Sequence, residues 1–166
     1  MGFFNKLFGN HKEKGNTSNL FAPMEGAVVP VTEVPDPTFA AGMLGDGIAI
    51  IPTDGKVCAP CDATVDMMFT TGHAVSLTTE FGAEILIHVG LETVSLGGKP
   101  FQVHVSSGQQ VKKGQILMTA DLDAIKAAGL NTITPMLVCN SGDFSVFKKM
   151  TGKDATHDDV VIELEK

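Results

Sequence analysis

Short apolar runs make up most of the chain from Leu20 onward, and glycine or proline interrupts them at roughly 8 to 12 residue intervals. Nine strands are predicted, at residues 24–32, 47–51, 63–69, 73–79, 83–89, 101–105, 115–119, 136–139 and 160–164. Many short strands at this spacing are typical of closed or doubly layered β folds. We therefore expect an all-β protein, an antiparallel β-sandwich or barrel-sandwich hybrid with a few short helical turns.

Helical signals are few and short. Asp36 followed by Pro37 and closed by Gly42 has the order of an N-cap, a proline at the first helical position and a C-cap glycine, which predicts a turn over residues 37–41. Residues 121–129 repeat this order from an aspartate to a glycine. A third short turn is expected at residues 143–150.

The first 19 residues differ from the rest. Phe4, Leu7 and Phe8 fall on one face of a short amphipathic segment, and a polar, glycine- and asparagine-containing stretch follows. Residues 1–19 are therefore predicted to be a flexible amphipathic leader and tether, and residues 20–166 a single domain. The leader could lie on an anionic membrane surface, dock a partner, or be a frayed tail, because helices this short are marginal in water.

Composition narrows the possible functions. The chain has 166 residues, a net charge of −7 and no arginine, which argues against a nucleic-acid partner because such proteins need a dense cationic face. Any phosphate chemistry must then use histidine, lysine or backbone amides. No apolar run approaches the ~18 residues of a membrane span, and no secretory signal is recognisable, so we expect a cytoplasmic protein.

Two histidines are the candidate reactive groups. Residues 71–90 are predicted to form a β-hairpin, and a two- or four-residue loop around Glu80 and Phe81 would place His73 directly opposite His88. Directly opposed residues point to one face with Cβ atoms ~5 Å apart, so the two rings could touch. A three-residue loop would shift the pairing by one and send the two side chains to opposite faces.

Paired neutral imidazoles offer one nucleophilic nitrogen and one group that stabilises what the nucleophile acquires. A phosphoryl group on one ring could accept hydrogen bonds from the other ring, from Thr71 and from backbone amides. Two alternatives remain. His73 and His88 could be ordinary strand residues, or they could form a zinc site, as in a zinc-binding or zinc-peptidase-like barrel-sandwich protein.

Cysteines offer a weaker candidate site. Cys58 and Cys61 form a Cys-Ala-Pro-Cys motif, which is compatible with redox chemistry or zinc. The motif lies in a turn between predicted strands, whereas thioredoxin-like chemistry places it at a helix N-terminus, and no second cysteine pair completes a zinc site. We therefore interpret both residues as compact hydrophobic side chains.

Four stretches together resemble one known family. They read Gly-Asp-Gly-Ile-Ala-Ile at 45–50, Ala-Pro at 59–60, Thr-Gly-His-Ala at 71–74, and Glu-Ile-Leu-Ile-His-Val-Gly-Leu-Glu-Thr-Val at 84–94. They closely resemble the glucose-type enzyme IIA component of the bacterial phosphoenolpyruvate:sugar phosphotransferase system. The resemblance runs from about Leu20 to Glu165, and the leader looks like that of stand-alone members rather than of a domain fused to a permease.

This resemblance implies roles for the two histidines and their partners. His88 would accept a phosphoryl group from the phosphohistidine of the small histidine-containing phosphocarrier protein and pass it to a cysteine on the IIB domain of a sugar permease. His73 would stay unphosphorylated, orient His88 and stabilise the phosphohistidine, and Thr71 would support His73. No cofactor is expected, although a partner's carboxylate could complete a zinc site with the two histidines.

A partner-binding face is also implied by the resemblance. Family carboxylates that meet the donor's arginine correspond to Asp36 and Glu92, the latter replacing an expected aspartate. A shallow, exposed apolar face would surround the site, built from Phe39, Met43, Leu44, Phe69, Leu86 and Val94. The family also includes regulators, so the same face could bind permeases, kinases or cyclases according to the phosphorylation state.

Overall fold

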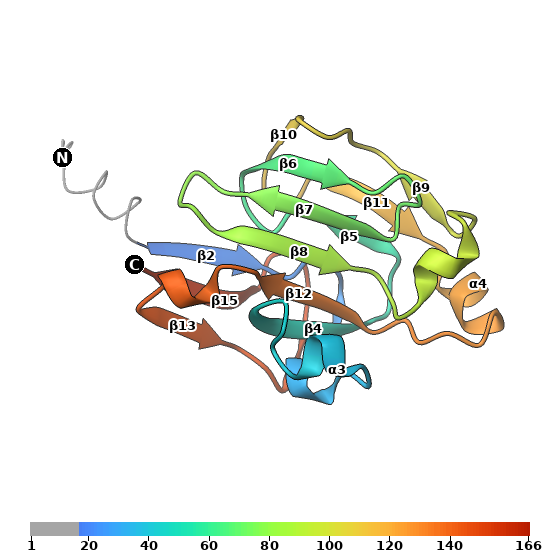
Figure 1. Ribbon diagram of the computed structural model, residues 1–166, viewed down its shortest axis with the longest axis horizontal. Coiled ribbons are helices and arrows are strands. Elements are labelled where there is room, and N and C mark those ends of the chain that lie inside the picture. Colours follow the sequence, from blue (N-terminus) through green and yellow to red (C-terminus); the bar gives the residue numbers. More distant parts are fainter. Residues whose placement is uncertain (1–16) are drawn as a thin grey trace.

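Antiparallel strands dominate the computed structural model, which describes residues 17–166 (Figure 1). The strands are β2 (Thr17–Phe21), β3 (Gly26–Pro30), β4 (Asp46–Pro52), β5 (Lys56–Cys58), β6 (Ala63–Met68), β7 (Ala74–Thr78), β8 (Glu84–His88), β9 (Phe101–Val103), β10 (Gln110–Val111), β11 (Ile116–Ala120), β12 (Thr134–Val138), β13 (Val146–Lys149), β14 (Lys153–Ala155) and β15 (Val160–Glu165). The helices are α3 (Pro37–Ala40) and α4 (Leu122–Ala127), with 3-10 turns η1 (Val31–Glu33), η2 (Thr93–Leu96) and η3 (Ser141–Asp143).

Three sheets share these strands. The largest has eight strands in the order β10-β6-β7-β8-β12-β4-β3-β14, and the others are β5-β11-β9 and β13-β15-β2. Every recorded strand pair is antiparallel, and apolar side chains from all three sheets meet in one core. The predicted all-β antiparallel sandwich is confirmed. In Figure 1, β7 and β8 lie in the middle of the largest sheet, with β12 beside β8.

Alternating burial along β7 and β8 shows which side chains point into the core and which point outward. Val75 and Leu77 on β7, and Ile85 and Ile87 on β8, are at most 1% exposed. Leu86 and His88 occupy the alternate positions of β8 and are half-buried. Because successive strand side chains point to opposite faces, His88 lies on the outer face at the end of an interior strand.

Two of the three predicted helical turns are confirmed. α3 begins at Pro37, and its N-cap Asp36 accepts a hydrogen bond from the backbone N–H of Thr38 at 2.9 Å. α4 begins after Asp121, which caps it in the same way through Ala124. The turn expected at residues 143–150 is wrong, because β13 occupies residues 146–149 and pairs with β15.

All nine predicted strands are present, and five further strands were missed. The missed strands are β2, β5, β10, β13 and β14, most of which have too few residues to show a periodic pattern. Residues 17–19, assigned to the tether, belong to β2 and pair with β15. The leader prediction for residues 1–16 lies outside the described residues. Within residues 17–166, no helix is long and apolar enough to cross a bilayer.

Candidate functional site

The hairpin that carries both histidines has a different register from the predicted one. Ala74, not His73, lies opposite His88, and Thr78 lies opposite Glu84. The loop is the three residues 80–82, with Gly82 at a φ of 100° and the hydroxyl oxygen of Thr79 accepting hydrogen bonds from the N–H groups of Gly82 and Ala83. The prediction that His73 stands directly opposite His88 is therefore wrong.

The two imidazoles nevertheless meet. Their ring centroids are 5.1 Å apart, and the planes cross at 77°. His73 precedes β7, in the turn where the N–H of Gly72 donates to the carbonyl of Phe69 at 2.7 Å and Gly72 has a φ of 71°. Because His73 lies outside β7, its side chain need not follow the alternating orientation of the strand residues. It points to the end of the sheet where His88 lies.

Gly90 determines which nitrogen of His88 carries the proton. Nδ1 of His88 lies 2.7 Å from the Gly90 carbonyl oxygen. A carbonyl can only accept, so Nδ1 must donate its proton, and the neutral ring then has an unprotonated Nε2. Gly90 was part of the quoted motif but not among the predicted site residues. A glycine two residues after the histidine is the available signal, because its φ of 75° favours glycine.

Thr71 holds the second ring, since its Oγ1 is hydrogen-bonded to Nδ1 of His73. A hydroxyl can donate or accept, so this bond is compatible with either tautomer of His73. Phenylalanines pack against both rings: Phe39 lies 5.1 Å from the His88 centroid, and Phe69 lies 5.3 Å from the His73 centroid. Both imidazoles therefore have restricted orientations.

Burial keeps both imidazoles neutral. It lowers the pKa of His73 below its ordinary value of 6.5, and the neighbouring His88 lowers that pKa further. Burial also lowers the pKa of His88, while the Gly90 hydrogen bond and the charge of Asp36 raise it and only partly offset the burial. Near neutral pH, His88 therefore presents a lone pair on Nε2 without first losing a proton.

These lowered pKa values predict a loss of stability in acid. Below pH 6.5 the unfolded chain takes up protons that the folded protein resists, so the free energy of unfolding falls as the pH drops from about 6.5 toward the lower folded pKa values and levels off below them. Urea denaturation at pH 7.5 and pH 5.5 should show a smaller acid loss for the double variant His73→Gln, His88→Gln than for the wild type. Equal losses in the two proteins would contradict the prediction.

Two predicted carboxylates belong to segments next to His88 in the fold or the chain. Asp36 caps α3 and is close enough to act on the pKa of His88. Glu92 is exposed, follows Gly90 by two residues and has a φ of 62°. Both predicted carboxylates therefore come from segments that adjoin His88, one from α3 and one from the turn after β8.

The six residues of the predicted apolar face differ in exposure. Met43 is 74% exposed, Val94 51% and Leu44 40%, while Phe69 and Leu86 are half-buried. Phe39 is only 5% exposed, so its expected place on an exposed face is wrong. It packs into a small core with Val31, Val34, Ala49, Leu91, Ile133 and Leu137, where it supports the His88 ring from below the surface.

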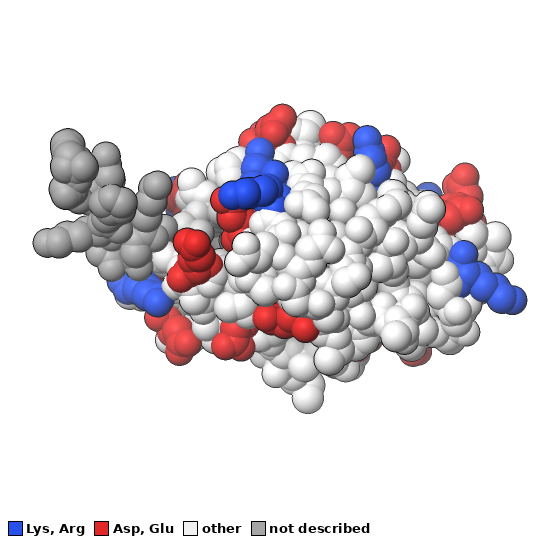
Figure 2. Space-filling model, turned by 90° about the horizontal axis from the view of Figure 1, so that it is seen from above, with Lys and Arg blue, Asp and Glu red and all other residues white. Residues whose placement is uncertain are grey.

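Charge is unevenly distributed over the surface. Residues 67–79 and 100–111 contain no lysine, aspartate or glutamate, and His73 lies in the first of these segments. Figure 2 shows a broad area without charged side chains, with charged groups gathered at its margins. Uncharged segments next to His73 lower the free-energy cost of covering this surface with a partner, because few charged groups lose their water.

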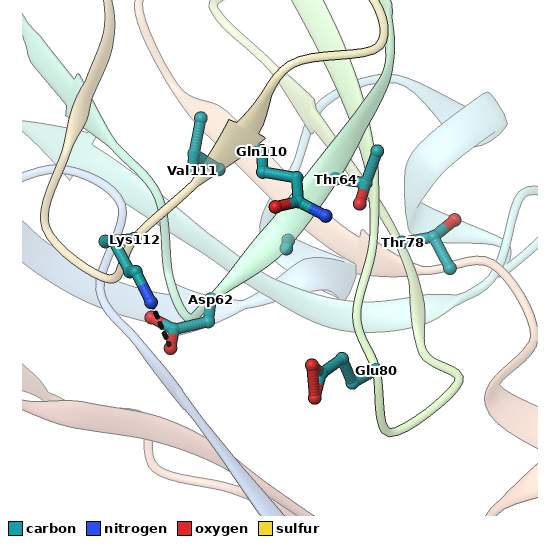
Figure 3. A pocket seen from close by; sticks show the side chains of 8 residues that line it. Asp62, Thr64, Thr78, Glu80, Gln110, Val111 and Lys112 are labelled. Atoms are coloured by element: carbon teal, nitrogen blue, oxygen red, sulfur yellow. Dashed lines mark ion pairs between the residues drawn. The ribbon is translucent and has the colours of Figure 1, made fainter.

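A polar pocket that the sequence analysis missed lies elsewhere. Its volume is about 300 Å³, and Asp62, Thr64, Thr78, Glu80, Gln110 and Lys112 are among its lining residues (Figure 3). Thr78, at the far end of β7, is five residues from His73 along the chain, or about 16 Å at the rise of a strand. The pocket is therefore at the opposite end of the hairpin and takes no part in the chemistry of the histidines.

The structure gives little support to a metal site or to redox chemistry at Cys58 and Cys61. Within residues 17–166, no group of three or more histidine, cysteine, aspartate or glutamate side chains is placed to hold a metal ion. Burial raises the pKa of Cys61 to about 12 and also raises that of Cys58, so both stay protonated thiols. Cys58 is buried at the end of β5, and its Sγ lies 3.8 Å from Nε2 of His157.

Comparison with known proteins identifies relatives of the whole fold. Residues 18–144 match the family described as phosphoenolpyruvate-dependent sugar phosphotransferase system, EIIA 1. The chain is 46% identical over 153 residues to the PTS system glucose-specific EIIA component of Bacillus anthracis, covering 92% of each chain. It is 47% identical over 150 residues to the mannose-specific EIIBCA component of Corynebacterium glutamicum, covering 90% of this chain and 22% of that longer protein.

A solved structure shows the same architecture. Glucose permease IIA from Mycoplasma capricolum matches with a TM-score of 0.79 and 34% sequence identity, covering 98% of this chain and 99% of that one. Nothing in these comparisons supports the zinc-peptidase alternative. The chain belongs to the EIIA 1 family of the phosphoenolpyruvate-dependent sugar phosphotransferase system, as a phosphotransferase component that carries a phosphoryl group on histidine in sugar uptake.

Proposed function

We propose that Nε2 of His88 is the atom that accepts the phosphoryl group. The observation that carries this proposal is the hydrogen bond from His88 Nδ1 to the Gly90 carbonyl, which leaves the Nε2 lone pair free. That lone pair attacks phosphorus while the bond from phosphorus to the donor's ring nitrogen breaks and returns its electron pair to the donor. One phosphorus–nitrogen bond replaces another, so catalysis is mainly positioning.

His73 is the stabilising partner in this proposal. If Thr71 donates its hydroxyl proton to Nδ1 of His73, the neutral ring carries its proton on Nε2. With ring centroids 5.1 Å apart, that N–H can donate to an oxygen of a phosphoryl group on His88. Thr71 therefore has a defined role, which is to select the tautomer that donates.

The partners follow from the family and from the surface around the site. The donor is the phosphohistidine of the small histidine-containing phosphocarrier protein, and the acceptor is a cysteine of the IIB domain of a sugar permease. Exposed Met43, Leu44 and Val94 provide apolar contact area. Asp36 and Glu92 provide carboxylates for cationic side chains of the donor. A small apolar face with few charges suits two partners that dock in turn and leave.

Glucose is the sugar we propose, because the stand-alone relative of similar length is named glucose-specific. A mannose-specific protein is similarly close in sequence, so the sugar is chosen by the membrane component rather than by this chain. For this division the chain must act on the cytoplasmic side, which is where we propose that it reaches the IIB domain. No cofactor takes part in the proposed transfer.

Intact-mass measurement tests the proposal. The protein is incubated with phosphoenolpyruvate, the general phosphotransferase enzyme and the small phosphocarrier. We expect the mass of one phosphoryl group to be added, and to be lost in acid but retained in base, as for a phosphohistidine. Omitting the phosphocarrier should leave the protein unmodified. A folded protein that gains no mass in the complete mixture would overturn the proposed function.

A further inference from the structure

The turn that follows His88 has an unusual backbone. Gly90 has a φ of 75° and Glu92 a φ of 62°, and Glu92 is the one non-glycine residue with positive φ within residues 17–166. Side chains disfavour this left-handed region, so such a conformation persists only where its surroundings over-determine it. This turn directs the Gly90 carbonyl toward Nδ1 of His88, so the contacts that hold the turn also hold this hydrogen bond.

Thr93 and Asn131 bracket the turn from two sides. The Thr93 side chain has no exposure, and its Oγ1 donates to the carbonyl of Val89 at 2.5 Å. On the other side of Gly90, the N–H of Leu91 donates to the backbone carbonyl of Asn131 at 2.9 Å. The peptide groups immediately before and after Gly90 are therefore both tied to fixed partners.

Packing leaves Gly90 little room to move. A Cβ atom at Gly90 would lie 2.6 Å from Cγ2 of Thr93 and 2.8 Å from the Asn131 carbonyl oxygen. Asn131 is itself held, because its Oδ1 accepts from the N–H of Ile133 at 2.9 Å. Both the hydroxyl and the methyl group of Thr93 thus act on the glycine whose carbonyl sets the tautomer of His88.

We propose that Thr93 is a positioning residue for the phosphoryl acceptor. By holding the turn of residues 89–92, it keeps the Gly90 carbonyl on Nδ1 of His88 and the Nε2 lone pair free. Its effect on the rate of transfer rests on the proposed function of His88, whereas its effect on the His88 tautomer does not. Thr93 need not touch the phosphoryl group to act in this way.

Variants at residue 93 separate the two groups of its side chain. Thr93→Val keeps the branched shape and removes the hydroxyl, while Thr93→Ser keeps the hydroxyl. In ¹⁵N-labelled unphosphorylated protein above pH 7, the ring-nitrogen shifts of wild-type His88 should report a proton on Nδ1. Thr93→Val should show a mixture of tautomers and slow phosphoryl acceptance about tenfold, less than the ~10²-fold cost of an ångström of misplacement. Thr93→Ser should have the wild-type tautomer of His88 and the wild-type rate of phosphoryl acceptance.

Thr79→Val is the matched control. Thr79 is also a buried threonine whose hydroxyl bonds to backbone groups, but it lies in the opposite loop of the same hairpin. This variant should lower stability while leaving the His88 tautomer and the acceptance rate as in the wild type. If Thr93→Val does not fold, Thr93→Ala removes the hydroxyl together with the methyl group and tests whether the Thr93 side chain as a whole sets the His88 tautomer.

Two results would overturn the proposal. One is a hydroxyl-free variant that keeps the proton of His88 fully on Nδ1, and the other is a shifted tautomer with no change in acceptance rate. Failure of the proposed function would look different, because the wild type itself would gain no phosphoryl group. In that case the tautomer comparison still decides whether Thr93 positions His88.

Discussion

His88→Ala should abolish phosphorylation completely. The substitution removes the nitrogen that attacks phosphorus, so no phosphorus–nitrogen bond can form at this position. Intact mass after incubation with phosphoenolpyruvate, the general phosphotransferase enzyme and the small phosphocarrier should show no added phosphoryl group, while the wild type is fully modified.

His104→Ala is the matched control for this result. His104 is an exposed histidine beyond β9, so its loss should leave phosphorylation intact. Thermal unfolding should show that His88→Ala is folded, since His88 is half-buried at the end of its strand. A folded His88→Ala protein that still gains an acid-labile phosphoryl group would place the acceptor on another residue, with His73 the first to test.

His73→Gln should separate acceptance from onward transfer. The Gly90 carbonyl sets the tautomer of His88 and leaves its Nε2 lone pair free, so the variant should still accept a phosphoryl group. Transfer to the IIB domain should slow by about 10²-fold, because a flexible amide holds the phosphoryl group less precisely than a ring fixed by Thr71 and Phe69. Single-turnover assays that measure each half-reaction separately will show this.

Complete loss of acceptance in a folded His73→Gln protein would contradict the proposed division of roles. Thr71→Val offers a related comparison, because it keeps the imidazole and removes only the hydroxyl that fixes its Nδ1. Its onward transfer should be slowed less than that of His73→Gln. Equal effects would mean that the tautomer of His73, rather than its presence, limits the reaction.

Several parts of the fold could be predicted because their cause is local. The caps of α3 and α4 follow from one aspartate each, whose side chain satisfies a backbone N–H two or three residues away. The nine predicted strands were recognised from apolar runs between glycines and prolines. In contrast, β13 became a strand because β15 pairs with it, and nothing in residues 143–150 alone indicates that partner.

In the site, too, residue types could be predicted from the sequence, whereas their geometry depends on the tertiary structure. Pattern and resemblance selected His73, His88 and Thr71, and the structure places these side chains together. The register used to bring the histidines together was wrong by one residue, because Gly82 closes a three-residue loop. They meet because His73 lies in the turn before β7, where it does not follow the alternation of the strand.

By itself, the sequence determined the strand-rich fold, the absence of arginine and the two histidines on which the family resemblance rests. Only the tertiary structure decided that Phe39 supports His88 from a buried position and that the Gly90 carbonyl sets its tautomer. It also revealed the threonine and asparagine that hold the strained turn. The reason is physical: residue type and local spacing act along the chain, whereas ring orientation, burial and lowered pKa values depend on segments that folding brings together.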